Sequence, residues 1–133
     1  MLFRSLVDSS VWIDYFNGVD CPETNRLDRL LSTEPVLTGD IILTEVLQGF
    51  DDEADFRRAR TMLTRLPFEP MLGRRVALQS AANYRRLRRQ GVTVRKAIDV
   101  MIATFCVLNN HALLHRDRDF DPMERWLDLK VAG

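Results

Sequence analysis

The sequence Ala97-Ile98-Asp99-Val100-Met101-Ile102-Ala103 decides the fold, because it opens a segment, residues 97–108, in which Asp99 is the single charged side chain. The apolar side chains of this segment cover nearly every side of a helix, so we expect the helix to be buried at the centre of the protein. Asp99 then cannot easily reach bulk water. A buried carboxylate without a partner is costly, and it either takes up a proton or finds a cation.

Around this central helix, short apolar strands alternate with helices along the chain. Strands are predicted at residues 2–8, 36–38 and 112–114, with a last one at 127–131. Helices are predicted at residues 9–16, 22–34, 41–47, 51–66 and 74–90, from a cap at Thr93 to residue 108, and from Asp121 onward. The alternation indicates an α/β fold with three layers, in which a mostly parallel central sheet is flanked by helices. Ligands of such sheets bind outside the carboxyl ends of the strands.

The length and charge of the chain limit its possible domain organisation and partners. The chain has 133 residues, which favours a single domain spanning residues 1–133. Its 19 basic and 19 acidic side chains cancel, so only a local patch or bound metal ions would hold a polyanion. The two cysteines, Cys21 and Cys106, form no CxxC pair, which fits a reducing, cytoplasmic location. Charged residues interrupt the first apolar run, and no stretch is apolar enough for a signal peptide or a membrane span.

Four acidic residues stand where acids are unexpected. Asp8 ends the first apolar strand, Asp117 follows the strand at 112–114, and Glu45 and Asp99 each interrupt a strongly apolar helix. Two of the four therefore follow strands, at the edge where this fold class places its sites. Carboxylates gathered in one cleft repel one another, and a hard divalent cation removes that repulsion.

Each acid also has a purely structural interpretation. Asp8 alone is explained equally well as the cap of the helix that follows it. Glu45 fits the polar edge of an amphipathic helix or an ion pair with an arginine. Asp99 is spaced for an ion pair with Arg95, one helical turn earlier. Asp117 and Asp119 alternate with arginines, as in a solvated turn. The four together are harder to explain in this way than any one of them.

A cluster of carboxylates with Mg²⁺ or Mn²⁺ has a definite chemistry. These ions take oxygen ligands and keep several waters. Two ions about 4 Å apart clamp the attacking and the leaving oxygen of a phosphodiester. The sequence lacks the motifs of two other mechanisms, because it contains no glycine-rich phosphate loop and no G-x-S-x-G motif. The two histidines, His111 and His115, flank an extended run, which disfavours a metal-free ribonuclease with a histidine acid–base pair.

The helix at 74–90 separates an apolar side, with Val76, Ala77, Ala81, Tyr84 and Leu87, from a basic side. Residues 70–98 contain eight cations and no acid. This is either a solvated helix face or a track for substrate phosphates leading toward Asp99. Under the second interpretation Arg85, Arg86 and Arg95 are candidate substrate-binding residues.

Taken in order, four segments resemble the PIN-domain ribonucleases, and more narrowly the VapC toxins of bacterial VapBC toxin–antitoxin pairs. These segments are Leu6-Val7-Asp8-Ser9-Ser10-Val11-Trp12-Ile13, Thr44-Glu45-Val46-Leu47-Gln48-Gly49, Ile98-Asp99-Val100-Met101-Ile102-Ala103 and Leu114-His115-Arg116-Asp117-Arg118-Asp119-Phe120. The resemblance implies a PIN-like fold and an endoribonuclease that hydrolyses RNA phosphodiester bonds with metal-activated water at an acidic Mg²⁺ or Mn²⁺ site.

Carried over by position, the family's acids correspond to Asp8, Glu45, Asp99 and Asp117, as catalytic residues and metal ligands. Asp8 and Asp99 rank highest as direct ligands, because a strand end and a buried helix are rigid places. Ser10 supports a ligand carboxylate by a hydrogen bond, and Asp119 substitutes for Asp117. His115 stands where the family often has serine or threonine, and we expect it to contact neither metal nor substrate.

The resemblance also implies partners. They are an RNA substrate, a VapB-like antitoxin whose C-terminal segment lies in a groove near the acids, and a second copy of the chain. Phe50, Phe56 and Leu63 are candidates for that groove, or alternatively core residues. Two other functions compete with the toxin hypothesis: a non-catalytic PIN-like module that binds protein or RNA, and a nuclease of related fold directed at DNA.

Overall fold

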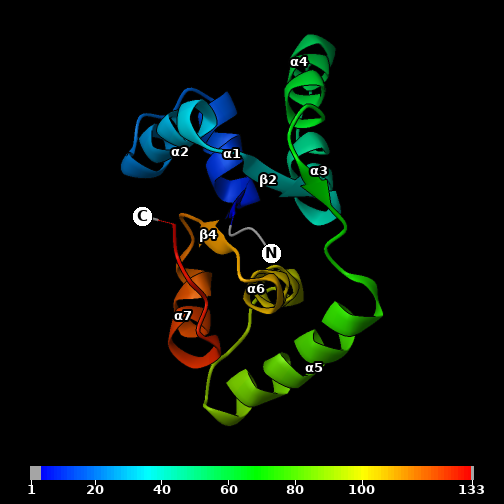
Figure 1. Ribbon diagram of the computed structural model, residues 1–133, viewed down its shortest axis with the longest axis vertical. Helices are drawn as coiled ribbons and strands as arrows, with labels where there is room; N and C mark the ends of the chain where they lie inside the picture. Colours follow the sequence, from blue (N-terminus) through cyan, green and yellow to red (C-terminus); the bar gives the residue numbers. More distant parts are fainter. Residues whose placement is uncertain (1–3, 133) are drawn as a thin grey trace.

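The computed structural model describes residues 4–132, and its centre is a four-stranded sheet in the order β3-β2-β1-β4 (Figure 1). The strands are β1 (Ser5–Val7), β2 (Val36–Gly39), β3 (Phe68–Glu69) and β4 (Ala112–Leu114). Every pairing is parallel, and Leu6 of β1 lies opposite Leu37 on one side and Leu113 on the other. The predicted parallel sheet is confirmed, while positions 2 and 3 of the first predicted strand lie outside the described residues.

Seven α-helices and one 3₁₀-helix connect and flank the strands in the described part of the chain. They are α1 (Ser9–Phe16), α2 (Pro22–Thr33), α3 (Asp40–Leu47), α4 (Glu53–Leu63), α5 (Gly73–Arg89), α6 (Ala97–Asn109), η1 (Arg118–Phe120) and α7 (Asp121–Leu127). In Figure 1, α1 to α4 lie on one side of the sheet and α5 to α7 on the other. The predicted three-layer α/β/α architecture is therefore confirmed. Between residues 4 and 132, no helix combines the length and the apolar character that crossing a membrane requires.

Helix α6 is the buried centre of the second helical layer, as its sequence predicts. Its side chains from Ile102 to Cys106 are all buried. Helix α5 packs along it, and a buried hydrogen bond of 2.9 Å from Asn83 Nδ2 to Thr104 Oγ1 joins the two.

That hydrogen bond explains why the buried face of α5 differs from the predicted one. The face consists of Val76, Ser80, Asn83 and Leu87. Ala77 and Ala81, expected to be buried, are exposed. Because Asn83 finds a polar partner inside the protein, its side chain is buried although apolar periodicity alone would place it outside.

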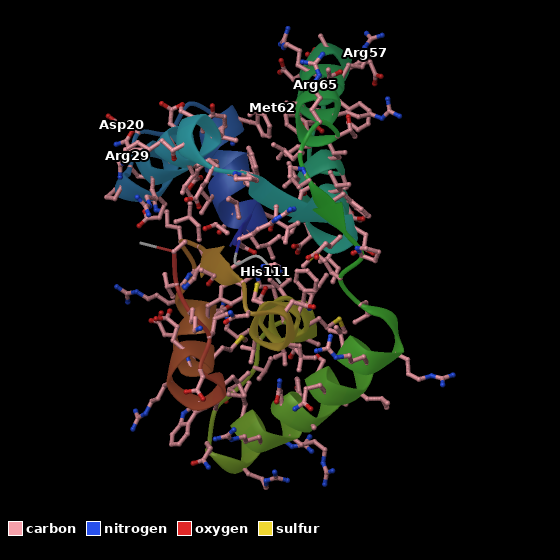
Figure 2. All side chains as sticks on the ribbon, in the orientation of Figure 1. Asp20, Arg29, Arg57, Met62, Arg65 and His111 are labelled. Carbon is pink, nitrogen blue, oxygen red and sulfur yellow. The ribbon has the colours of Figure 1, made fainter. Side chains whose placement is uncertain are left out.

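Strand β3 has no clear signal in the sequence, because it is two residues long and lies between Pro67 and Pro70. Tertiary contacts hold it. Asp40 Oδ1 accepts a hydrogen bond of 3.0 Å from the backbone of Met71, and Glu69 Oε2 lies 2.9 Å from Nε2 of the buried His111. Figure 2 shows His111 near the centre of the molecule, between the sheet and α6.

Two local predictions are wrong. Helix α6 begins at Ala97 rather than after a cap at Thr93, because Val92 and Val94 pack against the core from the segment that precedes the helix. Residues 127–131 form no strand. Helix α7 continues to Leu127 and ends at Asp128 with φ +59°, and only an isolated parallel bridge between Leu113 and Val131 remains.

Candidate metal and active site

Four elements bring Asp8, Glu45, Asp99 and Asp117 together at the carboxyl edge of the sheet. Asp8 directly follows β1 and Asp117 follows β4 by three residues, while Glu45 lies on α3 and Asp99 in the first turn of α6. Strands β1 and β4 are neighbours, and the chain reaches β4 only after passing through β2 and β3 at the other side of β1. Open α/β sheets bind ligands at such a switch in strand order.

Asp8 is both the cap of α1 and a member of this cluster. Its Oδ2 accepts hydrogen bonds from the backbone N–H of Ser10 at 3.1 Å and from Ser10 Oγ at 2.5 Å. Burial raises the pKa of Asp8 above its usual value, although the bonds to Ser10 oppose the shift. Capping uses only Oδ2 of Asp8. The same side chain can therefore cap α1 and still present its other oxygen to the cluster.

Glu45 reaches the cluster from α3. Its Oε1 accepts a hydrogen bond of 3.1 Å from Ser9 Oγ, the first residue of α1. Burial raises the pKa of Glu45, and the neighbouring charge of Asp8 raises it further. No arginine among residues 4–132 forms an ion pair with Glu45, so the predicted alternative of an arginine partner is wrong.

Asp99 and Asp8 are equally buried, at 4% relative exposure, but the carboxylate of Asp99 is the less satisfied of the two. Its Oδ2 has no hydrogen-bond partner within residues 4–132. Burial raises its pKa to about 6, and the charges of the other acids add to this shift against the lowering effect of Lys96. The partner is Lys96, whose Nζ lies 3.6 Å from Oδ2, and not Arg95, which instead approaches Asp119 at 3.7 Å.

Asp117 and Asp119 reach the cluster from η1, where Asp117 is the N-terminal cap and Asp119 is the second residue. Asp117 Oδ1 accepts a hydrogen bond of 2.9 Å from the backbone of Asp119, and its Oδ2 lies 3.4 Å from Lys96 Nζ. One ligand oxygen from each of Asp99, Asp117 and Asp119 lies within 4.8 Å of the others. Both acids are half-buried, so the turn is not simply solvated.

His115 holds the turn that carries Asp117. Its Nδ1 accepts a hydrogen bond of 3.2 Å from the backbone N–H of Asp117, and its Nε2 lies 3.0 Å from Glu124 Oε2 on α7. The ring packs against Phe120 at 4.9 Å between centroids. Because Nδ1 is an acceptor, the neutral ring carries its proton on Nε2 and donates it to Glu124. Nothing in the sequence indicated this bridge.

The three candidate substrate-binding arginines occupy different places. Arg95 lies at the rim of the cluster, next to Asp119. Arg85 lines a groove of about 390 Å³ between α5 and α6, together with Tyr84, Ala97 and Met101. Arg86 is exposed on α5.

This arrangement fits a hard divalent cation. Carboxylate oxygens from separate elements converge, one of them is buried without a hydrogen-bond partner, and an ammonium group already stands between two of them. Oxygen-rich clusters of this kind select Mg²⁺ or Mn²⁺ rather than softer metals. The fold and the site together define an α/β protein with a cluster of acids that could hold a metal ion at the switch point of a parallel sheet.

The comparison with protein families identifies that class. The family model of the PIN domain matches residues 5–125, so the chain belongs to the PIN domain family. It is similar to the VapC ribonuclease Mb1587 of Mycobacterium bovis and to ribonuclease VapC11 of Mycobacterium tuberculosis. Each is 31% identical over 131 residues, covering 96% of this chain and 97% of the relative. The resemblance to VapC-type PIN proteins is confirmed.

Solved structures agree on the fold. VapBC2 from Rickettsia felis, bound to a DNA fragment from its promoter, superposes with a TM-score of 0.78 at 16% identity. VapBC-1 from nontypeable Haemophilus influenzae superposes with a TM-score of 0.74 at 18% identity. Each comparison covers 98% of both chains. Helices and strands of this chain therefore follow the PIN fold through nearly their whole length.

Proposed function

We propose that this chain is a metal-dependent endoribonuclease, the toxin of a type II toxin–antitoxin pair that a VapB-like antitoxin neutralises. The observation that carries the proposal is the convergence of Asp8, Glu45, Asp99 and Asp117, residues from four elements far apart in the sequence, on one edge of the sheet. The names of the relatives, VapC ribonucleases, support the same activity.

The position of each acid in the fold indicates a different role in metal binding. Asp8 and Asp99, on a strand end and a buried helix, are the residues that would hold the ion most directly. Glu45 and Asp117 would complete its coordination, hold a second ion or orient water, and Asp119 stands behind Asp117. When bound, Mg²⁺ or Mn²⁺ supplies positive charge that offsets the phosphate and makes water more acidic.

The reaction itself is a hydrolysis. A water oxygen bonds to the phosphorus, and the bond from phosphorus to the 3′ oxygen breaks. The carboxylates accept the proton that the attacking water loses, and the departing 3′ oxygen takes a proton from solvent water. The products carry 5′-phosphate and 3′-hydroxyl ends. The 2′-hydroxyl takes no part as nucleophile, in agreement with the absence of a histidine acid–base pair, since His115 Nε2 pairs with Glu124 and His111 Nε2 with Glu69 in the described residues.

The groove between α5 and α6 is our candidate for the RNA path. It joins exposed apolar side chains to Arg85 and Arg88 and ends at Ala97, the first residue of the helix that carries Asp99. Arg95 extends the cationic character to the acids. A path of this kind supplies phosphate contacts without a net positive protein.

The antitoxin and a second copy of the chain complete the proposed assembly, which acts in the cytoplasm. A groove of about 240 Å³ between α1 and α3, lined by Ile13, Phe16, Val46 and Phe50, is the candidate antitoxin site. Phe50 packs on Phe16 at its rim, whereas Leu63 is fully buried and belongs to the core. Replacing Ile13→Asp is expected to weaken copurification with the antitoxin, and sedimentation of the free chain tests the dimer.

The decisive experiment incubates purified protein with matched RNA and DNA hairpins, with Mn²⁺ or with EDTA. We expect RNA to be cleaved with Mn²⁺ and not with EDTA, and the products to carry 5′-phosphate ends. The Asp99→Asn variant should not cleave RNA. Products ending in 2′,3′-cyclic phosphate reject the mechanism. Cleavage of DNA in preference to RNA, or Mn²⁺-free binding without cleavage, would replace the proposal by a DNA nuclease or a binding module respectively.

A further inference from the structure

The ammonium group of Lys96 stands among the acids of the site. Its Nζ lies 3.6 Å from Oδ2 of Asp99 and 3.4 Å from Oδ2 of Asp117. The residue immediately precedes α6, so its position is tied to the rigid helix that carries Asp99. Its side chain is half exposed, at 53%, whereas that of Asp99 is 5% exposed. The cation therefore approaches the cluster from the solvent side.

The kind of cation matters. The chain has 17 arginines and two lysines, Lys96 and Lys130, and one of these two is the residue between the carboxylates. An ammonium is a compact point charge on a flexible stem, whereas a guanidinium is a planar fork that binds one carboxylate through two bonds. A compact charge shared between two carboxylates resembles a small metal ion in its electrostatic effect.

The contacts of Lys96 with the two carboxylates are long, so another cation can replace its ammonium group. Neither distance is that of a short charged hydrogen bond, and Asp99 Oδ2 has no hydrogen-bond partner in the described chain. A divalent cation held by Asp99 and Asp117 would compete with Lys96 for the charge of the same two carboxylates. Two cations next to the same oxygens repel each other.

We infer that Lys96 is an internal counter-ion that occupies the cation position of the acid cluster in the metal-free protein and is displaced when a divalent ion binds. This inference rests on the proposed metal-dependent function. Its consequence is that Lys96 sets the metal affinity. The ammonium stabilises the metal-free site and opposes metal entry, so that the site fills only at higher metal concentration than the acids alone would require.

The first test measures Mn²⁺ binding by calorimetry and thermal unfolding in EDTA for the wild type, Lys96→Met and Lys130→Met. We expect Lys96→Met to bind Mn²⁺ about tenfold more tightly or better and to unfold at a lower temperature in EDTA, with the deficit reduced at saturating Mn²⁺. Lys130, whose Nζ donates to Asn110 Oδ1, is the matched control and should leave both quantities unchanged. An unchanged or weaker Mn²⁺ affinity in Lys96→Met overturns the inference.

The second test needs no variant that must fold. Reductive ¹³C-methylation of the whole chain labels the two lysines and the N-terminal amine, and NMR follows each signal. Saturating Mg²⁺ should shift the Lys96 signal and leave Lys130 in place. A Lys96 signal that does not move, in a protein that binds Mg²⁺ by calorimetry, overturns the inference. A wild type that binds neither ion contradicts the proposed function itself, which separates the two failures.

Discussion

The hydroxyl of Ser10 lies 2.5 Å from Oδ2 of Asp8, so the first turn of α1 fixes the orientation of a carboxylate in the candidate metal site. The backbone N–H of the same serine donates to the same oxygen at 3.1 Å. One oxygen of Asp8 is thereby engaged in helix capping and the other is left to the site. The same side chain therefore caps a helix and belongs to the candidate metal site.

Replacing Ser10→Ala should weaken both roles of Asp8. Loss of a hydrogen bond to a charged group lowers the free energy of unfolding by about 1–2 kcal/mol, measured by urea denaturation. Loss of the group that orients a ligand lowers Mn²⁺ affinity by about tenfold, measured by calorimetry. Ser32→Ala, which removes an exposed hydroxyl bonded to a helix carbonyl, is the control. A Ser10→Ala protein with unchanged Mn²⁺ affinity would contradict the orienting role.

The raised pKa of Asp99 predicts how stability depends on pH without metal. The folded group titrates at about 6, whereas the unfolded group titrates near 3.8. Between these values the folded protein holds a proton that the unfolded chain has lost, so stability falls as the pH rises through this window and stays low above it. Burial raises the pKa of Asp8 and Glu45 in the same direction, so both add to the fall.

Asp99→Asn should therefore be more stable than the wild type in EDTA at pH 8, by roughly 1–3 kcal/mol. The difference should shrink as the pH falls through this window and disappear below about pH 3, where Asp99 is protonated in both states. Urea denaturation across this pH range measures it, with the exposed Asp51→Asn as control. A variant that is less stable than the wild type at pH 8 would contradict this prediction, because it would mean that the pairing with Lys96 outweighs the cost of burying the carboxylate.

Substitutions of the acids should separate direct ligands from supporting residues. Asp8→Asn and Asp99→Asn should each lower RNA cleavage by about 100-fold or more, because each removes a carboxylate that would hold the metal ion whose positive charge offsets the phosphate. Asp119→Asn should lower it by less than about tenfold, since its main contact is with Arg95. Circular dichroism checks that each variant folds. Equal losses in Asp99→Asn and Asp119→Asn would contradict this ranking.

Charge reversal on α5 tests the proposed RNA path. The pair Arg85→Glu and Arg86→Glu should weaken binding to single-stranded RNA and reduce the slope of log affinity against log salt by about 1–2. Arg57→Glu on α4 is the control, and Figure 2 shows Arg57 at the opposite end of the molecule from α5. Binding is measured in EDTA, so that cleavage does not interfere. A salt slope unchanged by the double reversal means that this face of α5 is simply solvated.

Much of the fold was predictable because its signals are local. The apolar character of residues 97–108 predicted a buried central helix, and α6 is buried. The strands β1, β2 and β4 follow from short apolar runs. The fourth strand, β3, was not predictable, because two residues between prolines carry no periodicity and are held by Asp40 and His111. The assignment of a last strand at 127–131 failed for the opposite reason, since apolar residues there pack without forming a ladder.

The candidate acids could also be predicted from the sequence, because a charged residue inside or directly after an apolar segment is unusual. Their partners were not. The spacing of Arg95 and Asp99 suggested an ion pair along α6, yet Arg95 precedes the helix and approaches Asp119. Lys96 takes its place because the chain is extended at this point, where helical spacing does not apply.

By itself, the sequence determined the alternation of strands and helices, the burial of α6 and the presence of unusual acids, because hydrophobic periodicity and charge placement act within a few residues. Only the tertiary structure decided that Ser9 meets Glu45, that His115 holds the turn of Asp117, and that Lys96 stands between two carboxylates. Ser9 and Glu45 are 36 positions apart in the sequence, and Lys96 and Asp117 are 21 apart. Such contacts depend on the directions in which side chains leave their elements, and those directions are set when the layers pack together.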